Sequence, residues 1–168
     1  MIIQDDLLPE EQFQAIVSAI VYNDRFPWFY CGEIVDDQET SDFQFTHSVF
    51  FHREGVLSPG LQVLRPILDI LDPLALIRIK VNGIARTDEI IEHTLHRDAG
   101  RITNPEWTTS VFYLNTNNGY TLSEDGTKVE SVANRMATFP SNVLHTGTSS
   151  TDENMRVCVN FNYFGNVK

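Results

Sequence analysis

Apolar residues near the start of the chain recur at helical spacing. Five of them fall on one face of a helix: Phe13, Ile16, Val17, Ile20 and Val21. Pro9 and the two acids after it come directly before this stretch, and both residue types are typical of a first helical turn. The pattern predicts a helix that begins close to residue 9 and packs one face against a core.

A stripe of leucines predicts a second helix. Its members are Leu61, Leu64, Leu68 and Leu71, and Ser58 and Pro59 before them are typical of a helix start. Pro66 lies inside the stripe, so we expect the helix to be kinked there or to begin after it. Between the two helical stretches, the bulky run at 26–30 (Phe-Pro-Trp-Phe-Tyr) predicts packing over the core.

Alternating and β-branched positions predict strands in the rest of the chain. Residues 43–51 alternate, and His47 shares the apolar side of that strand, where we expect a hydrogen-bonded core histidine. Beyond Pro73, short segments separated by turn residues predict further strands: 75–81, 89–96, 108–115, 128–132, 136–139 and 155–163. Many short strands favour a β barrel or jelly roll. We therefore expect one domain over 1–168, with a largely helical part at 1–73 packed on β structure that follows it.

Composition and charge narrow the class of partner. The chain has 168 residues, 42% of them hydrophobic, and a formal net charge of −11. Proteins that bind nucleic acids carry a basic face that neutralises phosphates, and no cluster of Lys and Arg stands out here. A nucleic-acid partner is therefore disfavoured. The acidic stretch at 33–42 predicts a solvated loop, with a substrate lid as the alternative.

The sequence shows no segment typical of export or of a membrane. The first residues lack the positive start and apolar run of a signal peptide, and no stretch approaches the roughly 20 apolar residues that span a bilayer. We expect a cytoplasmic protein. Cys31 and Cys158 are too few and too far apart for a disulfide framework, and we expect both to be small buried residues.

Two histidines and one aspartate form a candidate metal site. His96 and Asp98 are two positions apart, so in an extended segment their side chains point to the same face, while His93 points away. His145, which follows a strand and a turn, is the best candidate for a third ligand. Two imidazoles and one carboxylate leave adjacent positions of an octahedral ion open, an arrangement that suits non-haem iron(II).

A charged residue in a strand-like segment strengthens this hypothesis. Arg156 lies within the apolar run at 155–161, where a guanidinium is costly unless an anion meets it. A dicarboxylate with a free distal end would provide that anion. The alternative is an internal salt bridge to one of the acids of the chain.

Taken together, these motifs resemble the iron(II)- and 2-oxoglutarate-dependent dioxygenases, most closely the prolyl-4-hydroxylase-like branch. The resemblance covers about 74–166 and rests on an ordered set of segments: His96-Arg97-Asp98, Val111 to Asn115, Arg135 to Pro140, His145-Thr146-Gly147, and Arg156. It implies a mainly β protein with N-terminal helices, in which residues 74–166 form a double-stranded β-helix (jelly-roll, cupin-like) core.

The resemblance also implies roles for single residues. His96, Asp98 and His145 would bind Fe(II), and Arg156 would bind the distal carboxylate of 2-oxoglutarate, the co-substrate. Tyr113 could offer its hydroxyl to the same carboxylate, with ordinary strand packing as the alternative; Thr148 and Asn82 are weaker candidates.

One segment departs from the family pattern. The branch often carries Gly-Gly-Glu-Thr after its Tyr-Leu-Asn strand, and this chain has Asn-Gly-Tyr-Thr at 118–121, which we expect on the substrate side. Dioxygen and a peptidyl (prolyl-like) or amino-acid substrate are the implied reactants, although a small metabolite stays open. A cupin-like binding protein and a zinc hydrolase are the alternative functions, and neither substrate identity nor oligomeric state follows from the sequence.

Overall fold

A computed structural model of the chain describes residues 1–32, 43–98 and 107–165. Two antiparallel sheets lie on opposite sides of the metal-site candidates. The main sheet has the strand order β1-β9-β6-β11-β5-β3-β2, with β4 paired to β3, and the small sheet has the order β10-β7-β8. The chain is thus mainly β with few helices, as the sequence predicts. The acidic stretch at 33–42, predicted as a loop or lid, lies outside the described residues.

The main sheet is built from eight strands: β1 (Ile2–Gln4), β2 (Phe29–Cys31), β3 (Gln44–Phe51), β4 (Gly55–Val56), β5 (Ala75–Ala85), β6 (Trp107–Tyr113), β9 (Met136–Pro140) and β11 (Met155–Phe164). The small sheet contains β7 (Tyr120–Ser123), β8 (Lys128–Glu130) and β10 (His145–Gly147). β11 runs along the centre, hydrogen-bonded to β5 on one side and β6 on the other. Its residues therefore occupy the middle of the sheet.

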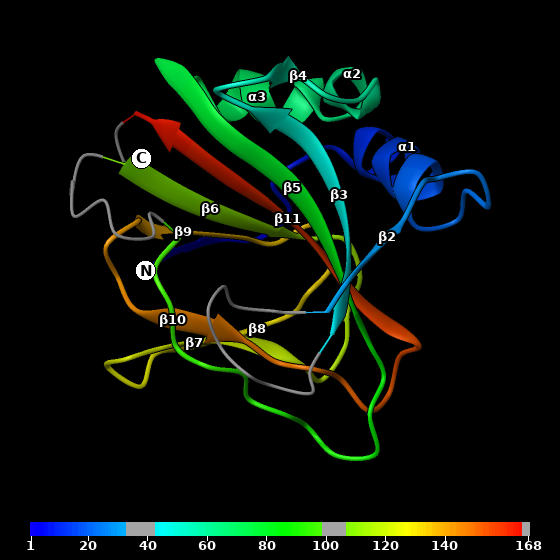
Figure 1. Cartoon of the computed structure of the whole chain (residues 1–168), viewed down its shortest axis with the longest axis vertical. Coiled ribbons are helices and arrows are strands. Elements are labelled where there is room, and N and C mark those ends of the chain that lie inside the picture. The colour runs from blue at the N-terminus through cyan, green and yellow to red at the C-terminus, as the bar shows by residue number, and fades with distance from the viewer. Residues whose placement is uncertain (33–42, 99–106, 166–168) are drawn as a thin grey trace.

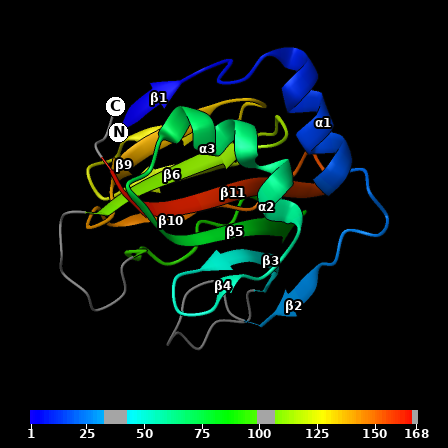
Figure 2. The ribbon, with the colours of Figure 1, turned by 90° about the horizontal axis from the view of Figure 1, so that it is seen from above.

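Three helices cover the face of the main sheet that is remote from the small sheet (Figures 1 and 2). They are α1 (Glu10–Ile20), α2 (Gly60–Val63) and α3 (Arg65–Leu71). The main hydrophobic core lies between helices and sheet, and its largest buried members include Ile16, Ile20, Phe112 and Phe161. None of the helices in the described ranges is long and apolar enough to cross a membrane.

The helix predictions hold with one refinement. Phe13, Ile16, Val17 and Ile20 are the buried face of α1, and Pro9 stands at its N-terminal cap. The leucine stripe divides into two short helices. Pro66 occupies the first turn of α3, and the helical conformation is interrupted at Leu64, between α2 and α3. Residues before 74 also supply β1 to β4, so this part is less helical than the sequence suggests.

Two further predictions fail locally. Segment 89–96 is not a strand and makes only isolated bridges, from Glu92 to Thr148 and from His96 to His145. The aromatic run at 26–30 is only partly in the core, since Phe29 is 60% exposed and Tyr30 is 70% exposed. Both belong to the edge strand β2, which has a pairing partner on one side only, so the sheet does not enclose them.

Candidate metal centre

His96, Asp98 and His145 converge between the two sheets. The ligand atoms that they offer all lie within 4.8 Å of one another. His96 and His145 exchange backbone hydrogen bonds of 2.9 and 3.0 Å, which sets their imidazole rings side by side, with ring centroids 4.8 Å apart. This isolated bridge, and not the strand that we predicted at 89–96, therefore positions His96 next to His145. His93 lies outside this cluster.

Local hydrogen bonds turn the same nitrogen of each imidazole toward the cluster. Nδ1 of His96 lies 3.2 Å from the carbonyl oxygen of Thr94, and Nδ1 of His145 lies 3.1 Å from that of Val143. A carbonyl only accepts, so both rings donate from Nδ1, which leaves Nε2 as the nitrogen that can bind a metal. Burial lowers the pKa of His96, and the charge of His145 lowers it further. A neutral imidazole is the form that binds metals.

Asp98 is ionised and held on several sides. Its Oδ2 accepts hydrogen bonds from Asn162 Nδ2 at 2.9 Å and from Thr109 Oγ1 at 3.2 Å. Its Oδ1 lies 3.2 Å from Arg78 Nη2 and 3.9 Å from His96 Nε2. Burial by itself would raise the pKa of this carboxyl, but the positive charges around it, Arg78 foremost, hold the pKa well below its usual value. Oδ1 accepts one hydrogen bond, from Arg78, and lies near His96 Nε2, so it is the oxygen that would bind a metal between the histidines.

Arg156 lies in the same cavity, which has a volume of about 60 Å³ and also receives His96 and His145. Its side chain is 2% exposed, and Nε donates to Ser131 Oγ at 2.7 Å while Nη2 donates to Thr121 Oγ1 at 3.1 Å. Over the described ranges of the chain, no Asp or Glu forms an ion pair with it. The alternative prediction, an internal salt bridge between Arg156 and an acid, is therefore not found among the described residues.

Two glycines make room for this guanidinium. A Cβ on Gly147 would lie 3.2 Å from Arg156 Nη1, and a Cβ on Gly119 would lie 2.8 Å from Arg156 Cδ. Tyr113 lies beside them: its ring centroid is 5.5 Å from Arg156 Cζ, and its hydroxyl donates to Thr121 Oγ1 at 2.8 Å. Segment 118–121 thus contacts Arg156 through Gly119 and Thr121, and its position on the substrate side stays a prediction.

The structure separates the weaker candidates. Thr148 is committed to the backbone, because its hydroxyl accepts from Tyr120 N and donates to Ser149 O. Asn82 lines the cavity, and its buried Oδ1 has no hydrogen-bond partner among the described residues. No pattern in the sequence singles out Ser131 or Asn162, since isolated polar residues carry no spacing pattern.

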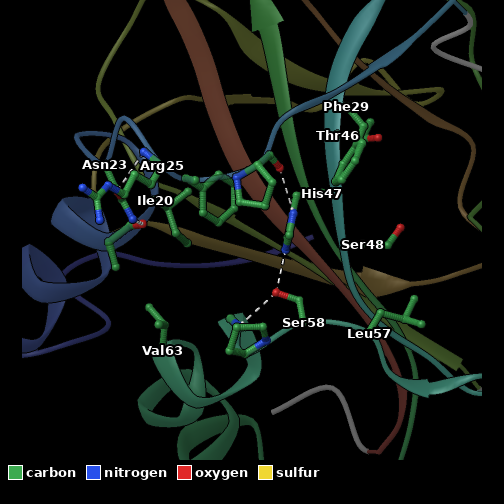
Figure 3. A pocket seen from close by; sticks show the side chains of 15 residues that line it. Ile20, Asn23, Arg25, Phe29, Thr46, His47, Ser48, Leu57, Ser58 and Val63 are labelled. Atoms are coloured by element: carbon green, nitrogen blue, oxygen red, sulfur yellow. Dashed lines mark hydrogen bonds between the residues drawn. The ribbon is translucent and has the colours of Figure 1, made fainter.

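A second hollow, of about 670 Å³, lies away from this centre, between α1, β2, β3 and α2 (Figure 3). His47 points between Pro27 and Ser58 there: its Nδ1 lies 2.9 Å from Pro27 O and its Nε2 lies 2.6 Å from Ser58 Oγ. It is 5% exposed and satisfied at both nitrogens, which confirms the prediction of a core histidine. The two hollows share no lining residue.

Comparison with solved structures supports the fold of this chain. No protein-family model and no curated protein matches the chain. Among solved structures, the alpha ketoglutarate dependent epimerase SnoN superposes with a TM-score of 0.69 at 10% identity, covering 97% of this chain and 77% of SnoN. SnoN has also been solved with Fe3+ and alpha ketoglutarate.

Two further structures have the same arrangement. A prolyl hydroxylase from Trichoplax adhaerens, in complex with a peptide fragment, superposes with a TM-score of 0.67 at 13% identity, covering 97% of this chain and 82% of that one. A 2OG-Fe(II) oxygenase family protein from Burkholderia pseudomallei gives 0.62 at 16%, covering 97% and 83%. The chain therefore has the fold of the iron(II)- and 2-oxoglutarate-dependent oxygenases, the superfamily that its sequence resembles.

Proposed function

We propose that this protein is an iron(II)- and 2-oxoglutarate-dependent dioxygenase with a double-stranded β-helix core. One observation carries the proposal. The cavity lined by the two histidines of the His96, Asp98 and His145 cluster is also lined by a buried guanidinium, Arg156, with no acid paired to it in the described parts of the chain. A metal that binds together with a dicarboxylate explains both the cluster of metal ligands and the buried guanidinium of Arg156.

The donor set fits iron(II). Two Nε2 atoms and one carboxylate oxygen leave adjacent coordination positions open, as non-haem iron oxygenases require. Arg156 would hold the distal carboxylate of 2-oxoglutarate, because its fork of N–H groups matches a carboxylate. The Tyr113 hydroxyl is joined to Arg156 through Thr121, which lines the cavity. The orphaned Asn82 Oδ1 indicates that this cavity is built to receive a polar ligand.

When bound, iron and 2-oxoglutarate use dioxygen to supply an oxidant strong enough to attack a C–H bond. The chain holds the three ligands in place before any metal arrives: two backbone carbonyls fix the imidazoles, and Asn162 and Thr109 fix Asp98. Arg156 orients the co-substrate. Ile84 and Val111 form an apolar part of the cavity wall.

The proposed reaction is hydroxylation of a peptidyl (prolyl-like) or amino-acid substrate. The sequence resemblance to the prolyl-4-hydroxylase-like branch supports it. A zinc hydrolase is less well supported, because none of the described residues that line the cavity is an Asp or Glu that could serve as general base. The alternative of a cupin-like binding protein does not explain why a guanidinium, that of Arg156, is buried beside the metal ligands.

Anaerobic titration with iron(II) and 2-oxoglutarate tests the proposal. A chelate at this site develops a visible charge-transfer band, and under air the enzyme releases succinate. His145→Ala is expected to abolish both signals, whereas His52→Ala, which changes an exposed histidine outside the cluster, should keep both. Full 2-oxoglutarate turnover in His145→Ala would remove this residue from the site, and the absence of band and turnover in the wild type would refute the function.

A further inference from the structure

Three cationic side chains gather on the face of the main sheet that carries the metal centre, although the chain has only 12 Lys and Arg and a net charge of −11. Arg156 has hydroxyl partners at one end, and Arg78 is paired with Asp98 at the other. The third is Lys80, on β5. Lys80 is neither a metal ligand nor a hydrogen-bond partner of Asp98.

Strand register places Lys80 on this face. It lies opposite Asn160 of β11, whose side chain lines the cavity, and two positions before Asn82, which also lines it. Alternate residues of a strand share a face, so Lys80 points to the side on which the triad lies. Its charge interacts with those of Asp98 and His96.

Lys80 has no counter-ion in the described parts of the chain. Its side chain is partly buried, and it forms neither an ion pair nor a hydrogen bond there. The charge of Asp98 raises the pKa of Lys80, but Asp98 forms no ion pair with it and already bonds to Arg78 and Asn162. Burial lowers the pKa of Lys80, and the charge of Arg78 lowers it further. A desolvated ammonium group is costly unless an anion meets it.

Lys80 and Arg156 belong to different positions along the same two strands. Arg156 lies opposite Ile84 of β5, four residues from Lys80. At 3.3 Å per residue this separates the two backbone positions by about 13 Å. An anion at Lys80 is therefore distinct from the carboxylate end that Arg156 holds.

We propose that the substrate oxidised at this site carries a free carboxylate that pairs with Lys80. This inference rests on the proposed function and narrows it: the substrate is a carboxylic acid such as a free amino acid, and a peptidyl residue without a neighbouring carboxylate is excluded. Lys80 is then a specificity residue, which distinguishes an acid from its amide by charge.

Matched pairs of probes test the proposal. Free amino acids and their carboxamides, for instance L-proline and L-prolinamide, are added to the enzyme with iron(II) and 2-oxoglutarate. Two signals are followed: succinate release under air, and the shift of the charge-transfer band without oxygen. We expect at least one acid to produce both signals and its amide to require at least tenfold higher concentration.

Variants of the lysine complete the design. Lys80→Met, of similar volume, should raise the half-saturating concentration of that acid at least tenfold and bring acid and amide together, while Lys80→Arg should retain part of the preference. The half-saturating concentration of 2-oxoglutarate should stay within twofold. Lys128→Met, at an exposed lysine of β8, is the matched control and should behave as the wild type.

Several outcomes would overturn the inference without touching the proposed function. The wild type could respond equally to acid and amide, or no acid could produce a signal in either assay. Lys80→Met could keep the wild-type preference for the acid, or it could require a higher concentration of 2-oxoglutarate. The last result would assign Lys80 to the co-substrate. Loss of the band and of 2-oxoglutarate turnover in the wild type would instead refute the proposed function itself.

Discussion

Replacing Arg156 with methionine should show whether this residue serves to bind 2-oxoglutarate or to stabilise the fold. If the guanidinium pairs with 2-oxoglutarate, its loss removes one partner of a buried, hydrogen-bonded charge pair. Such truncations cost about 2–5 kcal/mol, which corresponds to a rise of about 30-fold to 5,000-fold in the dissociation constant of the co-substrate. Anaerobic titration of the iron(II) enzyme, followed through the charge-transfer band, measures this directly.

The same substitution should leave the metal-free protein nearly as stable as the wild type. Only Ser131 loses a partner outright, because Thr121 keeps its hydrogen bond from Tyr113. Leaving the buried Ser131 hydroxyl without its partner costs about 1–3 kcal/mol, and the methionine offsets most of this because it buries an apolar side chain where a charge without a counter-ion stood. Urea unfolding of the metal-free protein should therefore show a change of about 1 kcal/mol or less.

The opposite pair of results would refute this reasoning. A guanidinium that held the fold together through an ion pair would cost about 3–5 kcal/mol of stability when removed. If Arg156→Met unfolds at much lower urea while its titration with 2-oxoglutarate is unchanged, the residue is structural. Arg156→Lys is the control: it keeps the charge and loses the fork, so its co-substrate affinity should fall between those of methionine and arginine.

Three further predictions concern the surroundings of the centre. Asn162→Ala removes one of the two hydrogen bonds to Oδ2 of Asp98 and should weaken iron(II) binding about 10- to 100-fold in a metal titration; an unchanged affinity would contradict the positioning role. Gly119→Ala sets a Cβ 2.6 Å from a backbone carbonyl oxygen and should lower the free energy of unfolding by about 1–3 kcal/mol; a stable variant would mean that segment 118–121 can shift. Ser58→Ala leaves the buried imidazole of His47 without a partner on Nε2 and should cost about 1–3 kcal/mol in urea unfolding. Its 2-oxoglutarate turnover should stay at the wild-type level, because this hollow does not reach the metal centre.

Much of the fold follows from local pattern. Helix α1 was predictable because its apolar residues repeat at the helical period, and β5, β6, β9 and β11 because β-branched and aromatic residues crowd between turn residues. The exposed edge strand β2 was not predictable as such, since bulky aromatic residues indicate burial unless the position of the strand in the sheet is known. Segment 89–96 misled for the same reason: its apolar residues fit a strand, but only two of its residues pair.

By itself the sequence determined which side chains are candidates for chemistry. The spacing of His96 and Asp98 and the cost of a charged Arg156 in an apolar strand are local facts, legible without coordinates. Tertiary structure decided the rest. His145 meets His96 through a pair of backbone hydrogen bonds between segments far apart in the chain, and Arg78, Asn162 and Lys80 surround the centre because β5 and β11 are neighbours in register. Such contacts depend on how strands align across the sheet, and no local period in the sequence encodes that alignment.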